Sequence, residues 1–80
     1  MKNKKYFKTN DFCLASYILA KNISLINIVK NFSGKATFIF LKNQECRKLI
    51  DEFSHMRGRV EPLSFIGAQK KLKHLIYLKQ

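Results

Sequence analysis

The sequence predicts an α+β fold: a single small domain in which a helix, an antiparallel β-hairpin and two further helices follow one another. Apolar residues recur at helical spacing in three separate stretches, and two strand-like runs flank a short turn that contains glycine. The chain forms one domain, residues 1–80, because 80 residues leave no room for two. A hairpin alone is too small to be stable, so the helices must pack on it.

The N-terminal ten residues carry four lysines and no acid. Residues 1–8 are expected to form a basic arm or a short strand, and an extra strand is expected within residues 4–9. Three residues that can cap a helix follow, Thr9, Asn10 and Asp11. The next stretch, Phe12–Lys21, is predicted to be a helix. It is apolar around most of its circumference, so it lies at the centre of the core or is covered by a partner.

The hairpin is predicted from the β-branched run Ile23–Phe32 and the alternating run Ala36–Leu41. Ser33, Gly34 and Lys35 separate them, and the glycine suits a tight turn. Alternation in the second strand places Ala36, Phe38 and Phe40 on one side of the sheet and Thr37, Ile39 and Leu41 on the other. We expect Phe38 and Phe40 to be core residues.

The second helix is expected to begin after Asn43, which can cap it, and to end at Gly58. Its apolar stripe consists of Cys46, Leu49, Ile50, Phe53 and Met56. A short strand is expected near residues 59–61, before Pro62 opens the last helix. The inward stripe of that helix consists of Phe65, Ala68, Leu72, Leu75 and Ile76. Gly67 weakens it by about 1 kcal/mol unless close packing needs the space.

The net charge is +11, from sixteen lysines and arginines against five acids, and such an excess favours an acidic partner. The second helix is nearly self-neutralised, so the uncompensated cations lie on the arm, on the Arg57-Gly58-Arg59 corner and on the last helix. Taken alone, the lysines of the last helix are most simply explained as the solvent-facing side of that helix. We expect all three groups to converge on one surface, and the candidate nucleic-acid-binding residues are Lys4, Lys5, Lys8, Arg57, Arg59, Lys70, Lys71, Lys73 and Tyr77.

Catalytic and metal-binding motifs are not found. The order Cys13, Cys46, His55, His74 lacks the close pairs of structural zinc sites, and no nucleophile–base or phosphate-loop pattern is present. We therefore expect no enzyme activity, no metal and no cofactor. Two distant cysteines favour a reducing, cytoplasmic location. The apolar run Phe12–Ala20 is about half the ~20 residues that span a bilayer, so no transmembrane segment is expected.

The first functional hypothesis is a small basic protein that contacts the phosphate backbone of DNA or RNA with low sequence specificity. The aromatic rings among the cations, those of Tyr6, Phe7 and Tyr77, could stack on unpaired bases or could equally belong to the core. The alternative is a non-enzymatic interaction module or small regulator that binds an acidic protein partner or self-associates as a homodimer. Peripheral membrane binding is a weaker third reading, because a core this small needs the apolar stripe of the last helix.

The chain resembles a family of small prokaryotic and phage domains that is described only as a domain of unknown function. The resemblance lies in the segment YFKTNDFCLASYIL, a later FIF after a glycine turn, a proline and a final LKHLIY. The matching positions are Tyr6, Thr9, Asp11, Leu14, Ala15, Phe38, Phe40, Pro62, Leu72, Lys73 and Tyr77. The resemblance implies a shared fold and a phage or mobile-element setting, and it brings no assigned activity.

Overall fold

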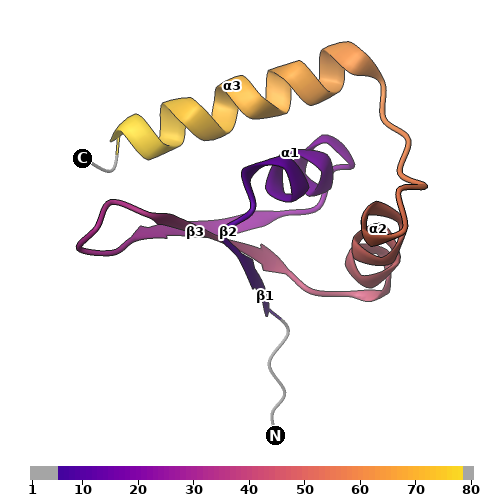
Figure 1. Cartoon of the computed structure of the whole chain (residues 1–80), viewed down its shortest axis with the longest axis horizontal. Coiled ribbons are helices and arrows are strands. Elements are labelled where there is room, and N and C mark those ends of the chain that lie inside the picture. Colours follow the sequence, from indigo (N-terminus) through magenta and orange to yellow (C-terminus); the bar gives the residue numbers. More distant parts are fainter. Residues whose placement is uncertain (1–5, 79–80) are drawn as a thin grey trace, which may run out of the picture.

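The computed structural model describes residues 6–78, which form three strands and three helices, an α+β arrangement (Figure 1). Their order along the chain is β1 (Tyr6–Thr9), α1 (Phe12–Ala20), β2 (Leu25–Lys30), β3 (Ala36–Leu41), α2 (Gln44–Ser54) and α3 (Pro62–Leu78). The predicted fold class and the order of its elements are confirmed. No strand forms at residues 59–61, which belong to the irregular loop between α2 and α3.

The three strands form one antiparallel sheet in the order β1-β3-β2. The hairpin of β2 and β3 is confirmed, although its first strand is shorter than predicted, and Phe32 lies fully exposed in the turn. The strand expected within residues 4–9 is β1, which pairs with β3. Residues 4 and 5 lie outside the described part of the chain. Phe38 and Phe40 are buried, as expected.

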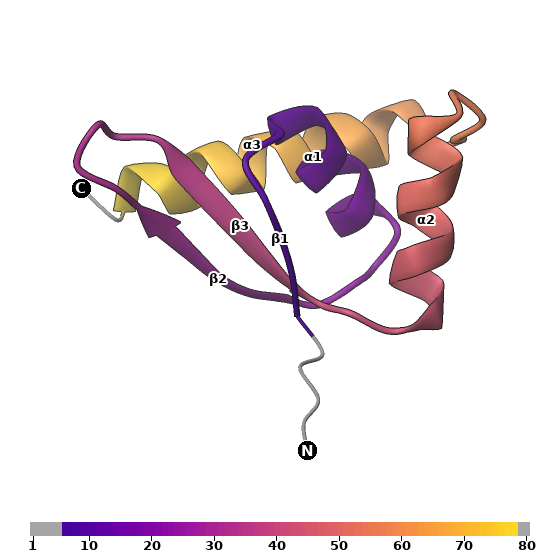
Figure 2. The ribbon, with the colours of Figure 1, turned by 60° about the horizontal axis from the view of Figure 1, so that its bottom comes forward.

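Helices α1 and α3 lie on one side of the sheet, and α2 stands at one end of it (Figures 1 and 2). Helix α1 is central, because every residue from Leu14 to Ile18 is buried and the helix packs against α3 and α2. Its apolar circumference therefore reflects a core position. The opposite face of the sheet is not covered by any helix in residues 6–78 (Figure 2).

Side-chain caps begin the helices where the sequence predicts. Asp11 Oδ1 accepts hydrogen bonds from the N–H groups of Cys13 and Leu14, and Asn43 Oδ1 accepts one from Cys46. Helix α3 begins at Pro62, and the carboxylate of Glu61 accepts the N–H of Ser64 at 2.8 Å. Each acceptor pairs a backbone donor that the first turn would otherwise leave unbonded.

The end of α2 differs from the prediction. The helix stops at Ser54, and Met56 rather than a glycine takes the left-handed conformation that follows, with φ 58°. Met56 consequently leaves the apolar stripe and is 93% exposed. Gly58 serves packing instead: a Cβ there would lie 3.0 Å from Cζ of Tyr17. Gly67 differs from Gly58, because nothing lies within 4 Å of the point where a Cβ would stand. Close packing by the described residues therefore does not explain why a glycine occupies this position.

Replacing Gly58 with alanine should lower the free energy of unfolding by about 1–3 kcal/mol, because the added methyl group overpacks a ring that cannot withdraw. The ring belongs to Tyr17, whose hydroxyl is hydrogen-bonded to Glu52 at 3.1 Å. The matched change Gly67→Ala meets no atom and should raise the same quantity by up to about 1 kcal/mol. Urea unfolding of both variants measures the difference, and equal effects would contradict the packing role of Gly58.

Glu61 should make stability depend on pH. Hydrogen bonds from the N–H groups of Leu63 and Ser64 lower the pKa of its carboxyl group. A carboxyl whose pKa is lower in the folded state stabilises the fold at neutral pH, and the effect disappears as the pH falls through that lowered pKa. Glu61→Gln should therefore destabilise the protein at neutral pH, and the difference should shrink as the pH falls below the ordinary glutamate pKa of about 4.3. Glu45→Gln makes the same charge change on α2, and thermal unfolding of both across this range measures the contrast.

Candidate nucleic-acid interface

Seven of the nine candidate residues lie in the described part of the chain, and Lys4 and Lys5 lie outside it. The seven fall into three groups. Lys70, Lys71, Lys73 and Tyr77 lie on α3, Lys8 lies on β1, and Arg57 and Arg59 lie in the loop between α2 and α3.

The group on α3 is set by the way this helix packs. Ala68 and Leu72 are buried against the core, and the other predicted stripe residues, Phe65, Leu75 and Ile76, are partly buried. At 3.6 residues per turn this leaves the opposite half of the helix in solvent. We call that half the α3 outer face, defined by the exposed residues Lys70, Lys71, Lys73, His74 and Tyr77.

The α3 outer face is electropositive because nothing in it compensates its lysines. Helix α3 contains no acidic residue between Pro62 and Leu78. Among residues 6–78 the ion pairs involve only Asp51, His55 and Arg57, so no carboxylate pairs with Lys70, Lys71 or Lys73. Tyr77 is 70% exposed, which leaves its ring available for stacking.

Lys73 and Lys71 project from opposite flanks of the helix. The Lys73 Nζ lies 5.9 Å from the ring centroid of Phe12, a cation–π contact that keeps its positive charge over the start of α1. Lys71 instead borders a hollow between α3 and the segment that leads into β2. Lys70 lies between them in the helical projection, so the three ammonium groups span the whole width of the outer face.

Lys8 points away from this face. It is exposed and lies opposite Ile39 in the register of β1 and β3, so both side chains leave the sheet on the side opposite the buried Phe38 and Phe40. Since α3 packs on the side of Phe38 and Phe40, the sheet itself separates Lys8 from the lysines of α3 (Figure 2).

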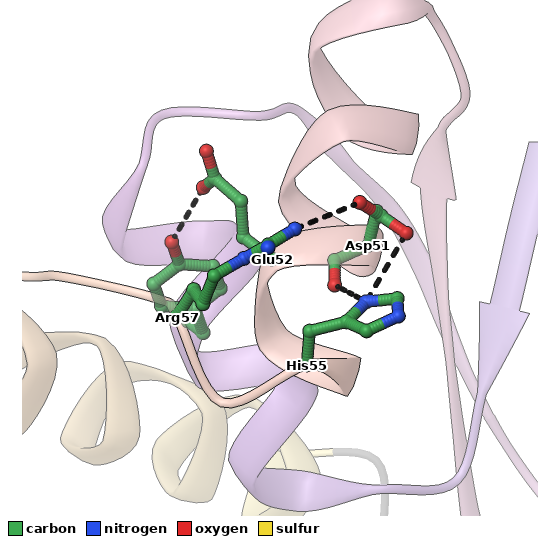
Figure 3. Close-up of polar contacts among 5 residues, drawn as sticks. Asp51, Glu52, His55 and Arg57 are labelled. Carbon is green, nitrogen blue, oxygen red and sulfur yellow. Dashed lines mark hydrogen bonds and ion pairs between the residues drawn. The ribbon is translucent and has the colours of Figure 1, made fainter.

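The arginine corner is mixed in charge. Arg57 lies 3.8 Å from Asp51, and Nδ1 of His55 lies 3.3 Å from the same carboxylate (Figure 3). Beside them the Tyr17 hydroxyl donates to Glu52, and burial, followed by this bond to Glu52, raises the pKa of Tyr17 and keeps the phenol protonated. Arg57 and Arg59 border one hollow together with Lys48, Asp51 and Glu52, so carboxylates partly neutralise this corner.

The seven described residues therefore do not form one continuous surface. The expected convergence of three groups is not what the structure shows, because Lys8 lies on the other face of the sheet and Arg57 is paired with an acid. The group that stays together and uncompensated is the α3 outer face. Of the seven described candidate residues, those of the α3 outer face are therefore the ones suited to contact a polyanion.

Other kinds of site find little support. Cys13 is exposed and Cys46 is fully buried, and burial raises the pKa of the Cys46 thiol above its ordinary value. Among residues 6–78 no three His, Cys, Asp or Glu side chains gather as metal ligands would. Over the same residues, no helix is both long and apolar enough to cross a membrane.

One feature that the sequence prediction missed is the hollow beside Lys71. Its walls come from α3 and from the segment around Asn22 to Leu25, and their meeting depends on tertiary packing that periodicity does not reveal. The one local signal was Gly67, a helix-interior glycine that the core does not require.

Comparison with protein families matches residues 4–78 to the Domain of unknown function (DUF5659). The chain belongs to this family. The match confirms the resemblance to a domain of unknown function, and DUF5659 carries no assigned activity. No curated protein and no solved structure gives a significant match to the chain.

Proposed function

We propose that this DUF5659 domain is a small nucleic-acid-binding protein that contacts the phosphate backbone through the α3 outer face. The observation that carries the proposal is the acid-free, solvent-facing half of a 17-residue helix that presents Lys70, Lys71 and Lys73 without a paired carboxylate. The proposed activity is binding and not catalysis.

The geometry of the face suits a phosphate backbone. Helix α3 is about 25 Å long, and its three lysines lie within one turn of the helix near its middle. Lysine contacts phosphate as a point charge, which gives affinity without reading the base sequence. Arg and Asn are missing between Pro62 and Leu78, and the one glutamine there, Gln69, is half-buried, so the helix lacks the planar side chains that read bases most specifically.

The exposed Tyr77 adds a contact for unpaired bases at the C-terminal end of the same face. Stacking of a base on a tyrosine ring contributes about 1–3 kcal/mol and tolerates any base. Tyr77→Ala should therefore weaken binding to a single-stranded probe more than binding to a duplex of the same length.

The double variant Lys70→Glu/Lys73→Glu should lose at least about tenfold in affinity, because two phosphate contacts become repulsive. The dependence of log K on log salt should also flatten by about 0.9 per lost phosphate contact on duplex DNA. Electrophoretic shift titrations at about 50 and 200 mM salt measure both quantities, with DNA and RNA probes in single- and double-stranded form.

The control is Lys42→Glu/Lys48→Glu, which makes the same change in net charge at the α2 end of the molecule. It should keep most of the affinity if the α3 outer face is the site, and thermal unfolding checks that both variants are folded. Equal losses in the two variants would show that binding follows net charge alone. Unchanged affinity in Lys70→Glu/Lys73→Glu would rule out this site.

A second candidate function is a protein-interaction module, and the hollow beside Lys71 favours it. Self-association as a homodimer is a separate prediction, and light scattering of the protein without nucleic acid tests it. The cytoplasmic location and the phage or mobile-element setting are predictions from cysteine usage and family resemblance.

A further inference from the structure

Two hollows on the surface are neighbours that share part of their lining, and we treat them as one groove. The first is about 650 Å³ and the second about 500 Å³, and both are bordered by Leu25 and Leu75. On one side the groove follows α3 from Ser64 to Leu78, a rise of about 21 Å. On the other side it follows the chain from the end of α1 into β2. We call it the α3–β2 groove.

One wall of the groove is a sheet edge. In the order β1-β3-β2, strand β2 has a neighbour on one side only. An edge strand presents backbone N–H and C=O groups that an extended chain can pair with, and this is a common mode of peptide recognition. Ile26 and Ile28 of this strand border the second hollow, and Ile26 is 49% exposed. The edge is not bare throughout, since the N–H of Ile28 donates to Asn27 Oδ1 at 2.8 Å.

The wall that α3 contributes to the groove lacks a side chain at Gly67. A glycine in a helix interior costs about 1 kcal/mol relative to alanine, and no atom of the chain needs the space at this position. Gly67 borders the groove between Ser64 and Lys71, so it opens the backbone of α3 to close approach from outside. Leu75 and Leu78 continue the wall as an apolar surface.

The charge of the groove selects its occupant. Among residues 6–78, Lys71 is the one charged residue that borders either hollow, and no carboxylate from this part of the chain does. A second copy of this chain is disfavoured, because it would bring a net charge of +11 against +11. A groove with a single cation among mostly apolar residues is also a poor fit for a phosphate backbone. An extended acidic chain supplies both the apolar side chains and the anion.

We infer that the α3–β2 groove binds an extended peptide of another protein, in which apolar residues alternate with Asp or Glu. A strand rises about 3.4 Å per residue, so about six residues fill the groove. Its backbone pairs with the free edge of β2, its apolar side chains lie against Leu25 and Leu75, and a carboxylate pairs with Lys71. This goes beyond nucleic-acid binding, since it uses a different surface from the centre of the α3 outer face.

The test is selection of a random ten-residue peptide library on the immobilised full chain, freed of nucleic acid beforehand. We expect enriched peptides to alternate apolar residues with Asp or Glu. Synthetic copies of the enriched peptides are then titrated by fluorescence anisotropy. Lys71→Glu should weaken their binding about tenfold or more, because the peptide then meets a like charge. Gly67→Leu should do the same, because the new side chain fills the groove.

Lys70→Glu is the matched control for Lys71→Glu, because it reverses the adjacent charge on the outer face and should leave peptide affinity unchanged within about threefold. Gly67→Leu should leave the affinity for nucleic acid unchanged, because it keeps the lysines that contact phosphate in place. The two proposals can therefore fail separately.

The inference is overturned if no peptide is enriched, if the enriched peptides lack acidic residues, or if Gly67→Leu binds them as the parent protein does. Displacement of the peptide by added duplex DNA that persists in Lys70→Glu/Lys73→Glu would assign the groove to nucleic acid instead. A dimer that Gly67→Leu abolishes, measured by light scattering, would assign it to a second copy.

Discussion

Burial of Tyr17 is the constraint on which the arrangement of the helices depends. The residue is 2% exposed, its ring lies 5.7 Å from that of Phe53, and its hydroxyl reaches Glu52. One side chain of α1 thus fixes α2, and the close approach of Gly58 to the same ring fixes the loop that follows. That loop sets where α3 begins, so the direction in which α3 crosses the sheet, and with it the orientation of its lysines, is linked to this contact.

Because the core is built on one side of the sheet, two surfaces face solvent: the outer side of α3 and the uncovered face of the sheet (Figure 2). Helix α1 is buried around most of its circumference, with Cys13 exposed at its start, whereas α3 uses one stripe and keeps its other half in solvent. The acids lie mostly on α2, at one end of the molecule, and α3 has none. Segregation of this kind gives a domain of 80 residues a basic, solvent-facing surface without loss of apolar burial, because the lysines and the core stripe occupy opposite sides of the same helix.

Features that depend on neighbouring residues were predictable from the sequence. The hairpin, the caps Asp11 and Asn43 and the start of α3 at Pro62 each follow from local chemistry. The end of α2 was not predictable, because Met56, a residue without a preference for positive φ, follows that helix in the left-handed conformation. The nearby Gly58 instead makes room for the ring of Tyr17. The place of Lys8 was not predictable either, since it depends on which face of β1 turns toward the helices. The expected cation surface was therefore only partly recovered, on α3.

The uncovered face of the sheet has a consequence for colloidal behaviour. Tyr6, Leu41 and Val29 are each more than a third exposed there, and such a surface invites stacking of one sheet on another. Lys8 interrupts it as a gatekeeper charge on the edge strand β1. The surplus of positive charge thereby acquires a second physical role: mutual repulsion between copies opposes such stacking, and this protection weakens as added electrolyte shortens the range of that repulsion.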